Sequence, residues 1–268
     1  MMEVKHERGY LVIAQNTDNV DYIECARALS RSLKQVQPTA KICLLTDQHI
    51  DDNNFDFVTT FPFGDRSQNS QWKLHNDWQC FYASPFRETI KLEADMLIPI
   101  SIEHWFDVCC KKEVVVTIGA RNYQNESSSV RTYRKIFDEN FLPDAYNAVT
   151  YWRRSHAAKE FFDLVRNIFE NWDRVMSLIK YGKDQPLNTD LAYAIALKTL
   201  GEEKYSLPDG VPGIIHMKPD INGIKGQDWS RELVWEISDD NLRINTVAQL
   251  WPFHYHIKDF AKRMSDGR

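Results

Sequence analysis

Two short apolar runs separated by one helical pattern constrain the fold of this chain most strongly. Residues 10–14 and 41–47 have the composition of strands that are buried on both faces, and each ends in polar residues. Between them, residues 22–36 carry apolar side chains every three or four positions, as an amphipathic helix does. Strand, helix and strand in this order form a βαβ unit, which requires parallel strands. The sequence therefore predicts an α/β, Rossmann-like domain.

Polar side chains follow both predicted strands at their carboxyl ends. They are Gln15, Asn16 and Thr17 after the first strand, and Thr46 and Asp47 at the end of the second. Ligands bind at this edge of open parallel sheets, so these residues are expected to line one crevice.

The rest of the chain continues the alternation of strands and helices. We expect strands at 57–60, 88–99, 112–118, 147–152 and 213–217, helices over 156–180 and 188–200, and an antiparallel hairpin from 233–237 and 242–245. No repeat or Pro/Gly/Ser-rich linker divides the sequence. We therefore predict one domain over residues 1–268, with a mostly parallel central sheet flanked by helices and a C-terminal β-hairpin extension.

Composition indicates the cellular compartment and the kinds of partner to expect for this chain. Residues 1–8 are charged, and no stretch approaches the roughly 18 apolar residues that cross a bilayer. The five cysteines are odd in number and lack CxxC spacing, which favours a reducing cytoplasm. A net charge of -5 argues against extensive coating of nucleic acid. The expectation is a cytoplasmic protein with no membrane partner and an oligomeric state that the sequence leaves open.

The segment Glu93-Ala94-Asp95 is the most informative candidate site. If residues 89–98 form one strand, alternation places both carboxylates on the same face, about 7 Å apart along the strand. Carboxylate oxygens suit Mg²⁺ or Mn²⁺. The same pattern also fits an ordinary polar strand face, and alternation alone does not decide between the two interpretations.

Four segments together resemble the metal-dependent GT-A glycosyltransferases, and family 8 in particular. They are Ala14-Gln15-Asn16-Thr17 with Asp21-Tyr22, Glu93-Ala94-Asp95, Asn147-Ala148-Val149-Thr150, and Asn188-Thr189-Asp190. The second is similar to the family's DxD motif with Glu in the first position, and the third lacks the family's glycine. The resemblance covers roughly residues 10–220 in order. It implies a GT-A fold, in which about residues 10–120 bind the nucleotide-sugar and about 121–268 form the acceptor half and the C-terminal extension.

The resemblance also implies roles for individual residues. Those expected to bind the nucleotide-sugar donor, a UDP-sugar by this resemblance, are Ala14, Gln15, Asn16, Thr17, Tyr22 and Ala94, with Lys73 and Lys218 as cations for the diphosphate. Glu93 and Asp95 would hold Mn²⁺ or Mg²⁺. Asp190 and Asn147 are the candidate catalytic residues beside the sugar and the acceptor. Transfer with retention of configuration is implied in the same way.

The third metal ligand has two candidates. Gly213–Pro219 contains His216 and resembles the family's late histidine segment in shortened form. In the rival segment, residues 253–258, alternation places His254 and His256 on one face with Lys258 beyond them. We favour His216 and keep His256 as the alternative.

The acceptor is the least constrained partner. The chain also resembles poorly characterised glycosyltransferase-like proteins of tailed phages, which implies hydroxymethylated DNA as an acceptor and the host cytoplasm as the location. The middle of the chain is locally basic, and we favour a solvated surface over a phosphate-binding face for these residues: Arg121, Arg131, Arg134, Lys135, Arg153 and Arg154.

Two other function classes compete with sugar transfer. One is a non-catalytic protein that binds nucleotide-sugars. The other is a sugar nucleotidyltransferase, which the lack of a glycine-rich phosphate loop after the first strand disfavours.

Overall fold

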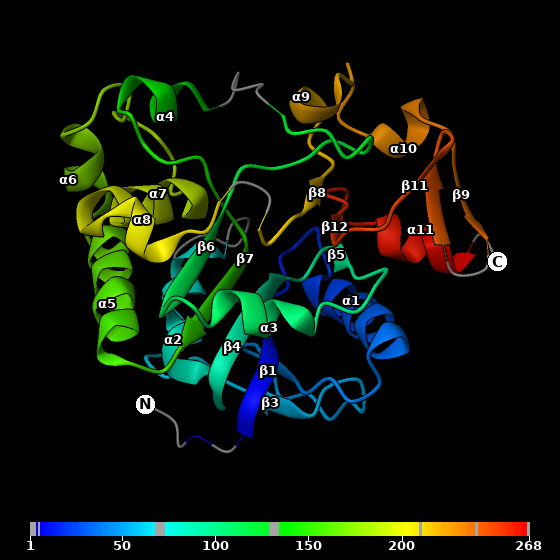
Figure 1. Ribbon diagram of the computed structural model, residues 1–268, viewed down its shortest axis with the longest axis horizontal. Helices are drawn as coiled ribbons and strands as arrows, with labels where there is room; N and C mark the ends of the chain where they lie inside the picture. The colour runs from blue at the N-terminus through cyan, green and yellow to red at the C-terminus, as the bar shows by residue number, and fades with distance from the viewer. Residues whose placement is uncertain are drawn as a thin grey trace.

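A six-stranded sheet forms the centre of the computed structural model, which describes residue 4 and residues 6–67, 73–128, 134–208, 211–238 and 241–266. Its strand order is β3-β2-β1-β4-β7-β6 (Figure 1). Strand β7 runs antiparallel to both neighbours, and the other paired strands are parallel. The bounds are β1 (His6–Ile13), β2 (Ile42–Leu45), β3 (Phe57–Thr59), β4 (Phe86–Glu93), β6 (Val114–Ile118) and β7 (Ala145–Arg153). The predicted α/β fold with a mostly parallel sheet is confirmed.

The predicted βαβ unit consists of β1, α1 (Tyr22–Val36) and β2. Helix α1 begins after Asp21, whose carboxylate accepts a hydrogen bond from the backbone N–H of Glu24. Its apolar face is buried, including Ile23 and Leu29. Strands β1 and β2 pair in parallel over residues 10–13 and 42–45. The polar residues after both strands therefore lie at one edge of the sheet.

Helices cover both faces of this sheet. Successive residues of a strand enter opposite cores, and Val12 packs with α1 and α3 (His104–Cys109), whereas Leu11 packs on the other face. That second face is covered by the 3₁₀ helix η1 (Leu74–Gln79), α2 (Cys80–Ala83), α5 (His156–Glu170) and α7 (Thr189–Leu200). This arrangement leaves the carboxyl ends of the parallel strands for a site.

The predicted strand over residues 88–99 is wrong, because the chain changes sheets within it. Strand β4 ends at Glu93, residues 94–95 form a turn, and β5 (Met96–Leu97) belongs to a separate sheet. In that sheet β5 pairs with β12 (Phe253–His254), which also pairs with β8 (Ile215–His216). The apolar alternation continues through Ala94 and Met96, so the pattern does not reveal the change of partner strand.

Two other predicted boundaries also change. The helix expected over 156–180 divides at Asn171, which ends α5 and precedes α6 (Trp172–Ser177). The C-terminal hairpin is present as β9 (Trp235–Ser238) and β10 (Asn241–Ile244), and with β11 (Val247–Ala248) it forms a third sheet. The remaining helices are α4 (Lys135–Glu139), α8 (Glu202–Tyr205), α9 (Pro219–Asn222), α10 (Trp229–Glu232) and α11 (Phe260–Asp266).

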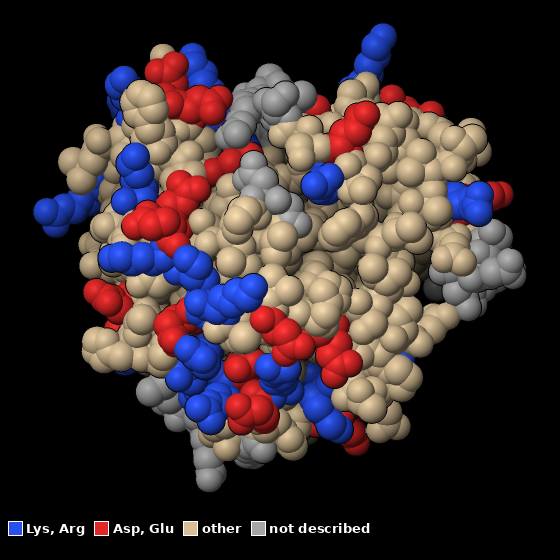
Figure 2. All heavy atoms as spheres, viewed as in Figure 1, with Lys and Arg blue, Asp and Glu red and all other residues tan. Residues whose placement is uncertain are grey.

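The surface carries both signs of charge. Figure 2 shows Lys and Arg interspersed with Asp and Glu on the face that carries α3 and the near ends of β1 and β4. Ion pairs account for part of this mixture, such as Arg8 with Asp107 and Arg153 with Glu113. Within the part of the chain that the structure describes, no helix is long and apolar enough to span a membrane.

Candidate active site

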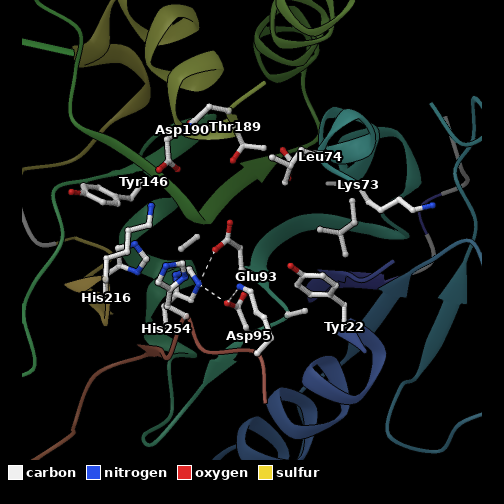
Figure 3. Close-up of a pocket in the computed structure, with 18 of the residues that line it drawn as sticks. Tyr22, Lys73, Leu74, Glu93, Asp95, Tyr146, Thr189, Asp190, His216 and His254 are labelled. Atoms are coloured by element: carbon white, nitrogen blue, oxygen red, sulfur yellow. Dashed lines mark hydrogen bonds and ion pairs between the residues drawn. The ribbon is translucent and has the colours of Figure 1, made fainter. Parts of the chain in front are cut away.

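A pocket lies at the carboxyl ends of β1 and β4 (Figure 3), where open α/β sheets place their ligands. Residues from both strand ends line it, together with the start of α7 and the C-terminal segment that carries β8 and β12. The lining residues that the argument uses are Gln15, Tyr22, Lys73, Asp77, Glu93, Ala94, Asp95, Asn188, Asp190, His216, Lys218, His254, His256 and Lys258.

Three of these side chains could hold a metal ion. One ligand atom each from Asp95, His254 and His256 lies within 4.8 Å of the other two. Asp95 Oδ2 is 2.8 Å from His254 Nε2 and also accepts a hydrogen bond from the ammonium of Lys258. The Nδ1 atom of His254 is buried without a hydrogen-bond partner among the described residues. One carboxylate and two imidazoles are a donor set that fits a divalent transition metal.

The electrostatics of the cluster keep two of these donors, Asp95 and His256, in the forms that bind metals. Burial alone would raise the pKa of Asp95, but the adjacent His254 and Lys258 side chains outweigh it and hold that pKa well below its ordinary value. Burial, followed by the influence of His254 and Lys258, lowers the pKa of His256 to about 3. At neutral pH, Asp95 is therefore a carboxylate and His256 a neutral imidazole with a lone pair.

Two of the three predicted metal ligands, Glu93 and His216, lie beside this group rather than in it. Glu93 Oε2 is 3.3 Å from His254 Nε2, and its side chain projects into the middle of the pocket (Figure 3). Burial, followed by the nearby charge of Asp95, raises the pKa of Glu93 despite the opposing effect of His254. The His216 ring stacks on His254 with ring centroids 4.5 Å apart. Both residues line the pocket, and their role as ligands stays a prediction.

The signal for His254 was present in the sequence as the alternation in residues 253–258. That alternation does not continue as a strand, since β12 stops at His254 and His256 has a positive φ of 62°. The two imidazoles nevertheless converge on Asp95, because the turn at 94–95 faces the end of β12. The pairing of β5 with β12 and a hydrogen bond from the N–H of Tyr255 to the carbonyl of Asp95 bring these segments together, and no local pattern encodes these long-range contacts.

Asp190 lies in the first turn of α7, which Asn188 caps by accepting a hydrogen bond from the N–H of Leu191. Asp190 Oδ1 accepts from the N–H of Asn147 at 2.7 Å, and Oδ2 accepts from Arg134 at 2.8 Å. Burial would raise the pKa of Asp190, but the charge of Arg134 and then that of Lys218 lower it overall.

The interpretation of Arg134 as a solvated surface residue is wrong. Its side chain is 1% exposed and bridges Asp144 and Asp190. Arg131, from the same basic segment, lies outside the described residues. A buried arginine paired with two carboxylates cannot be recognised from local charge. The partners of Arg134 are Asp144 and Asp190, which lie 10 and 56 positions further along the chain.

Asn147 is fully buried and belongs to a polar network beneath the pocket. Its side-chain amide donates to Asp77 Oδ2 at 3.0 Å, and Asp77 also accepts from Tyr193 and from the buried ammonium of Lys91. Asn147 is not among the residues that line the pocket, whereas Asp77 is. Asp77 was not predicted from the sequence, because its importance comes from a buried ion pair with Lys91 of β4.

The predicted nucleotide-binding residues divide into two groups. Gln15 and Tyr22 line the pocket, together with Ala94. Ala14, Asn16 and Thr17 are not among the lining residues. Asn16 instead accepts a hydrogen bond from the N–H of Ile23, and the N–H of Thr17 donates to the carbonyl of Val20. In this structure, these last two residues shape the loop that leads into α1.

Three lysines surround the pocket at different distances from the metal-binding group. Lys258 contacts Asp95 directly. Lys218 lies near enough to Asp190 and His216 to lower the pKa of both. Lys73 points away from the cluster in Figure 3, and its Nζ atom lies 3.8 Å from Asp65 Oδ2. Lys218 and Lys258 are therefore better placed than Lys73 to meet an anion beside Asp95.

Comparison with known proteins gives a fold rather than a family. No family model matches the chain, and no curated protein matches it. Among solved structures, the chain is similar to the glycosyltransferase GlyE of Streptococcus pneumoniae TIGR4, with 12% identity and a TM-score of 0.46, over 75% of this chain. It is also similar to the bifunctional glycosyltransferase WbbM, with 13% identity, a TM-score of 0.45 and 78% of this chain covered. The chain spans 45% of the length of GlyE and 40% of that of WbbM.

The galactosyltransferase LgtC gives the more complete match. Its structure with donor and acceptor sugar analogues has 13% identity to this chain and a TM-score of 0.50, and the match covers 96% of this chain and 94% of LgtC. At this level of identity the likeness concerns the fold. The chain therefore has the α/β GT-A fold that LgtC, a glycosyltransferase, also has.

Proposed function

We propose that this chain is a metal-dependent glycosyltransferase that moves a sugar from a nucleotide-sugar, UDP-linked in the first instance, to an acceptor hydroxyl. The observation that carries the proposal is the convergence of Asp95, His254 and His256 beside a pocket at the carboxyl ends of parallel strands. The GT-A fold supports the same reaction class. LgtC was solved with a donor analogue and an acceptor analogue, which makes a two-substrate site a reasonable expectation here.

The residues of the pocket suit the parts of such a donor. A divalent cation, Mn²⁺ or Mg²⁺, held by Asp95, His254 and His256 would neutralise the charge that builds up on the departing diphosphate. Lys218 and Lys258 also line the pocket, and both help to lower the pKa of His256, so they add positive charge near this group. Gln15 and Tyr22 lie on the side of β1 and α1, where the nucleotide is expected.

The state of Asp190 supports transfer with retention over inversion. Inversion needs a general base that takes the acceptor proton. Both carboxylate oxygens of Asp190 already accept hydrogen bonds, and Arg134 holds its pKa below the ordinary value. A carboxylate in this state is a weak base, so we assign Asp190 to charge stabilisation and to fixing the position of β7.

For the acceptor, we propose a hydroxyl compound without naming a narrower class. Hydroxymethylated DNA stays a candidate from the resemblance to phage proteins. The buried position of Arg134 removes one residue from the basic segment that could have contacted DNA phosphates.

Thermal unfolding with UDP, with and without Mn²⁺, tests donor binding. A site of this kind should raise the unfolding temperature more with both ligands than with either alone. The metal-dependent part should vanish in Asp95→Asn, a near-isosteric change, and persist in Asp51→Asn, an exposed aspartate elsewhere. No metal-dependent increase in the wild-type chain would contradict the proposal.

Donor hydrolysis separates an enzyme from a binding protein. The wild-type chain with Mn²⁺ should release UDP from at least one of several UDP-sugars, and an added acceptor should accelerate the release. Stabilisation by UDP and Mn²⁺ without any release would favour the non-catalytic binding protein instead.

A further inference from the structure

A buried ion pair beneath the pocket has no part in the function proposed above. Lys91 of β4 is fully buried, and its ammonium contacts Oδ1 of Asp77, which lines the pocket. Resting on the proposed function, we infer that Asp77, held in place by Lys91, selects the sugar that is transferred. Its carboxylate accepts a hydrogen bond from a sugar hydroxyl and disfavours donors whose sugar carries a carboxylate.

The position of Lys91 in the core calls for a reason beyond stability. Strand alternation sends Ile90 and Leu92 into one apolar core and Lys91 into the other, where lysine is almost never found unless it is paired. A buried ion pair is weak evidence for stability, because well-packed apolar residues of similar volume are often as stable. The pair is better explained by the work of its carboxylate at the pocket.

Three groups of the protein hold the carboxylate of Asp77 in one position. Oδ1 accepts a hydrogen bond from Lys91, and Oδ2 accepts one from the hydroxyl of Tyr193 at 2.8 Å and one from the amide of Asn147 at 3.0 Å. A carboxylate offers about four acceptor positions. The described residues fill both positions on Oδ2 and one on Oδ1, so a hydroxyl of a ligand can use the fourth.

Asp77 belongs to the wall of the pocket that lies opposite the metal-binding group. Figure 3 shows Leu74 and Asp190 on one side of the pocket and Tyr22 and Asp95 on the other. Asp77 shares the 3₁₀ helix η1 with Leu74 and lines the same pocket. On the proposed function, the diphosphate lies beside the metal and the nucleotide beside Tyr22. The sugar is then left for the wall that carries Asp77 and Asp190.

Two carboxylates on this wall set the kind of sugar that fits it. Hydroxyl groups are the hydrogen-bond donors of a neutral sugar, and an ionised acceptor binds them more strongly than a neutral one does. A uronic acid would bring a further negative charge toward Asp77 and Asp190, and like charges in a partly buried site repel each other. Neutral hexose donors are therefore expected to bind and hexuronate donors to be rejected.

The rival explanation is that Asp77 serves only as the counter-ion of Lys91. In that case, removing both charges together would leave donor binding unchanged. The double variant Asp77→Asn, Lys91→Met separates the two explanations, because it removes the pair without leaving one buried charge alone. Asp77→Asn with Lys91→Leu is the second version in case the first does not fold.

The test uses calorimetry on the full chain with Mn²⁺ to measure the dissociation constants of UDP, UDP-glucose, UDP-galactose and the two corresponding UDP-uronates. The wild-type chain should bind at least one UDP-hexose about tenfold or more tightly than its uronate. The double variant should bind that UDP-hexose more weakly and lose most of the preference, with UDP binding unchanged. The control is Asp56→Asn, Lys41→Met, an ion pair whose residues do not line the pocket, and it should keep the preference.

The outcomes separate this inference from the proposed function. Equal affinity of the wild-type chain for hexose and uronate, or an unchanged preference in a folded double variant, would overturn the inference. Donor hydrolysis is scored separately. A preference for UDP-hexose without any hydrolysis would count against the enzyme only, and hydrolysis of hexose and uronate donors at equal rates would count against the role of Asp77 only. Failure to bind UDP at all would contradict both.

Discussion

The carboxylate of Asp190 is held at both oxygens by groups of the protein itself. Arg134, its charged partner, also pairs with Asp144 and lies over the ring of Tyr146, with its guanidinium carbon 3.8 Å from the ring centroid. A buried guanidinium that contacts two carboxylates and an aromatic face leaves little freedom to any member of the group. Asp190 is thus positioned by the fold and does not depend on a substrate for its orientation.

Asp190→Asn should destabilise the chain by about 2 kcal/mol at pH 7, less than the usual cost of breaking a buried pair because Arg134 keeps Asp144. The pKa of Asp190 lies below that of an aspartate in the unfolded chain, so its contribution is present above about pH 4 and is lost as the pH falls below that value. Urea unfolding of both proteins between pH 7 and pH 3 measures this. A stability difference that stayed constant over the whole range would contradict the assignment.

The cysteines should differ sharply in reactivity. Burial raises the pKa of Cys25 to about 11 and those of Cys43 and Cys109 to about 12, and it raises the pKa of Cys80 further. Cys110 is only partly buried. Because the thiolate is the reactive form, one thiol per chain should react with a disulfide reagent at pH 8 in the native state, and five in denaturant. Cys110→Ser should abolish the native reaction, and rapid reaction of two or more thiols would show that the core is more open than described.

Several residues singled out in the sequence lie at the candidate site. Glu93, Asp95, His216, His256 and Asp190 were predicted from local patterns together with the resemblance to GT-A enzymes, and all line the pocket. Contacts that depend on the packing of distant segments were not predictable. The pairing of Arg134 with Asp190 is of this kind, as is that of Asp77 with Lys91.

Two helices begin with similar side-chain caps, one at the pocket and one away from it. Asn188 caps α7 at the pocket and accepts a hydrogen bond from the N–H of Leu191 at 3.0 Å. Ser155 caps α5 away from the pocket and accepts one from the N–H of Ala158 at 3.1 Å. Replacing either by alanine should cost about 1 kcal/mol of stability.

Only Asn188→Ala should also slow donor hydrolysis, because it loosens the helix turn that carries Asp190. Chemical denaturation and UDP release measure the two effects. Equal loss of activity in Asn188→Ala and Ser155→Ala would mean that the effect is general destabilisation.

Sequence patterns were sufficient to predict some helices and strands and failed to predict others. The βαβ unit was predictable because its strands, helix and polar strand ends are contiguous in the chain. The split of residues 88–99 into β4 and β5 was not, since both strands keep the same apolar alternation and only the partner strand changes. The short sheet of β5, β12 and β8 contains two-residue strands, which are too short to show any periodicity.

For the whole molecule, the net charge of -5 weighs against strong binding to plain duplex DNA, and the face shown in Figure 2 carries charges of both signs. The chain should pass through a phosphate-bearing cation-exchange column at neutral pH and 0.15 M salt without retention. Retention that disappears at higher salt would reveal a basic surface and strengthen the case for a DNA acceptor.

The sheet of β5, β12 and β8 has one more consequence, which concerns the order in which the chain acquires its parts. Asp95 and His254 are 159 residues apart, so the cluster cannot exist until the segment that carries β12 has docked against the turn after β4. Contacts of such long sequence separation form late in folding, because closing the loop between them is entropically costly. On the proposed function, a chain in which β12 has not yet docked would therefore be unable to hold Mn²⁺ at this cluster, and the metal site would be among the last parts of this fold to form.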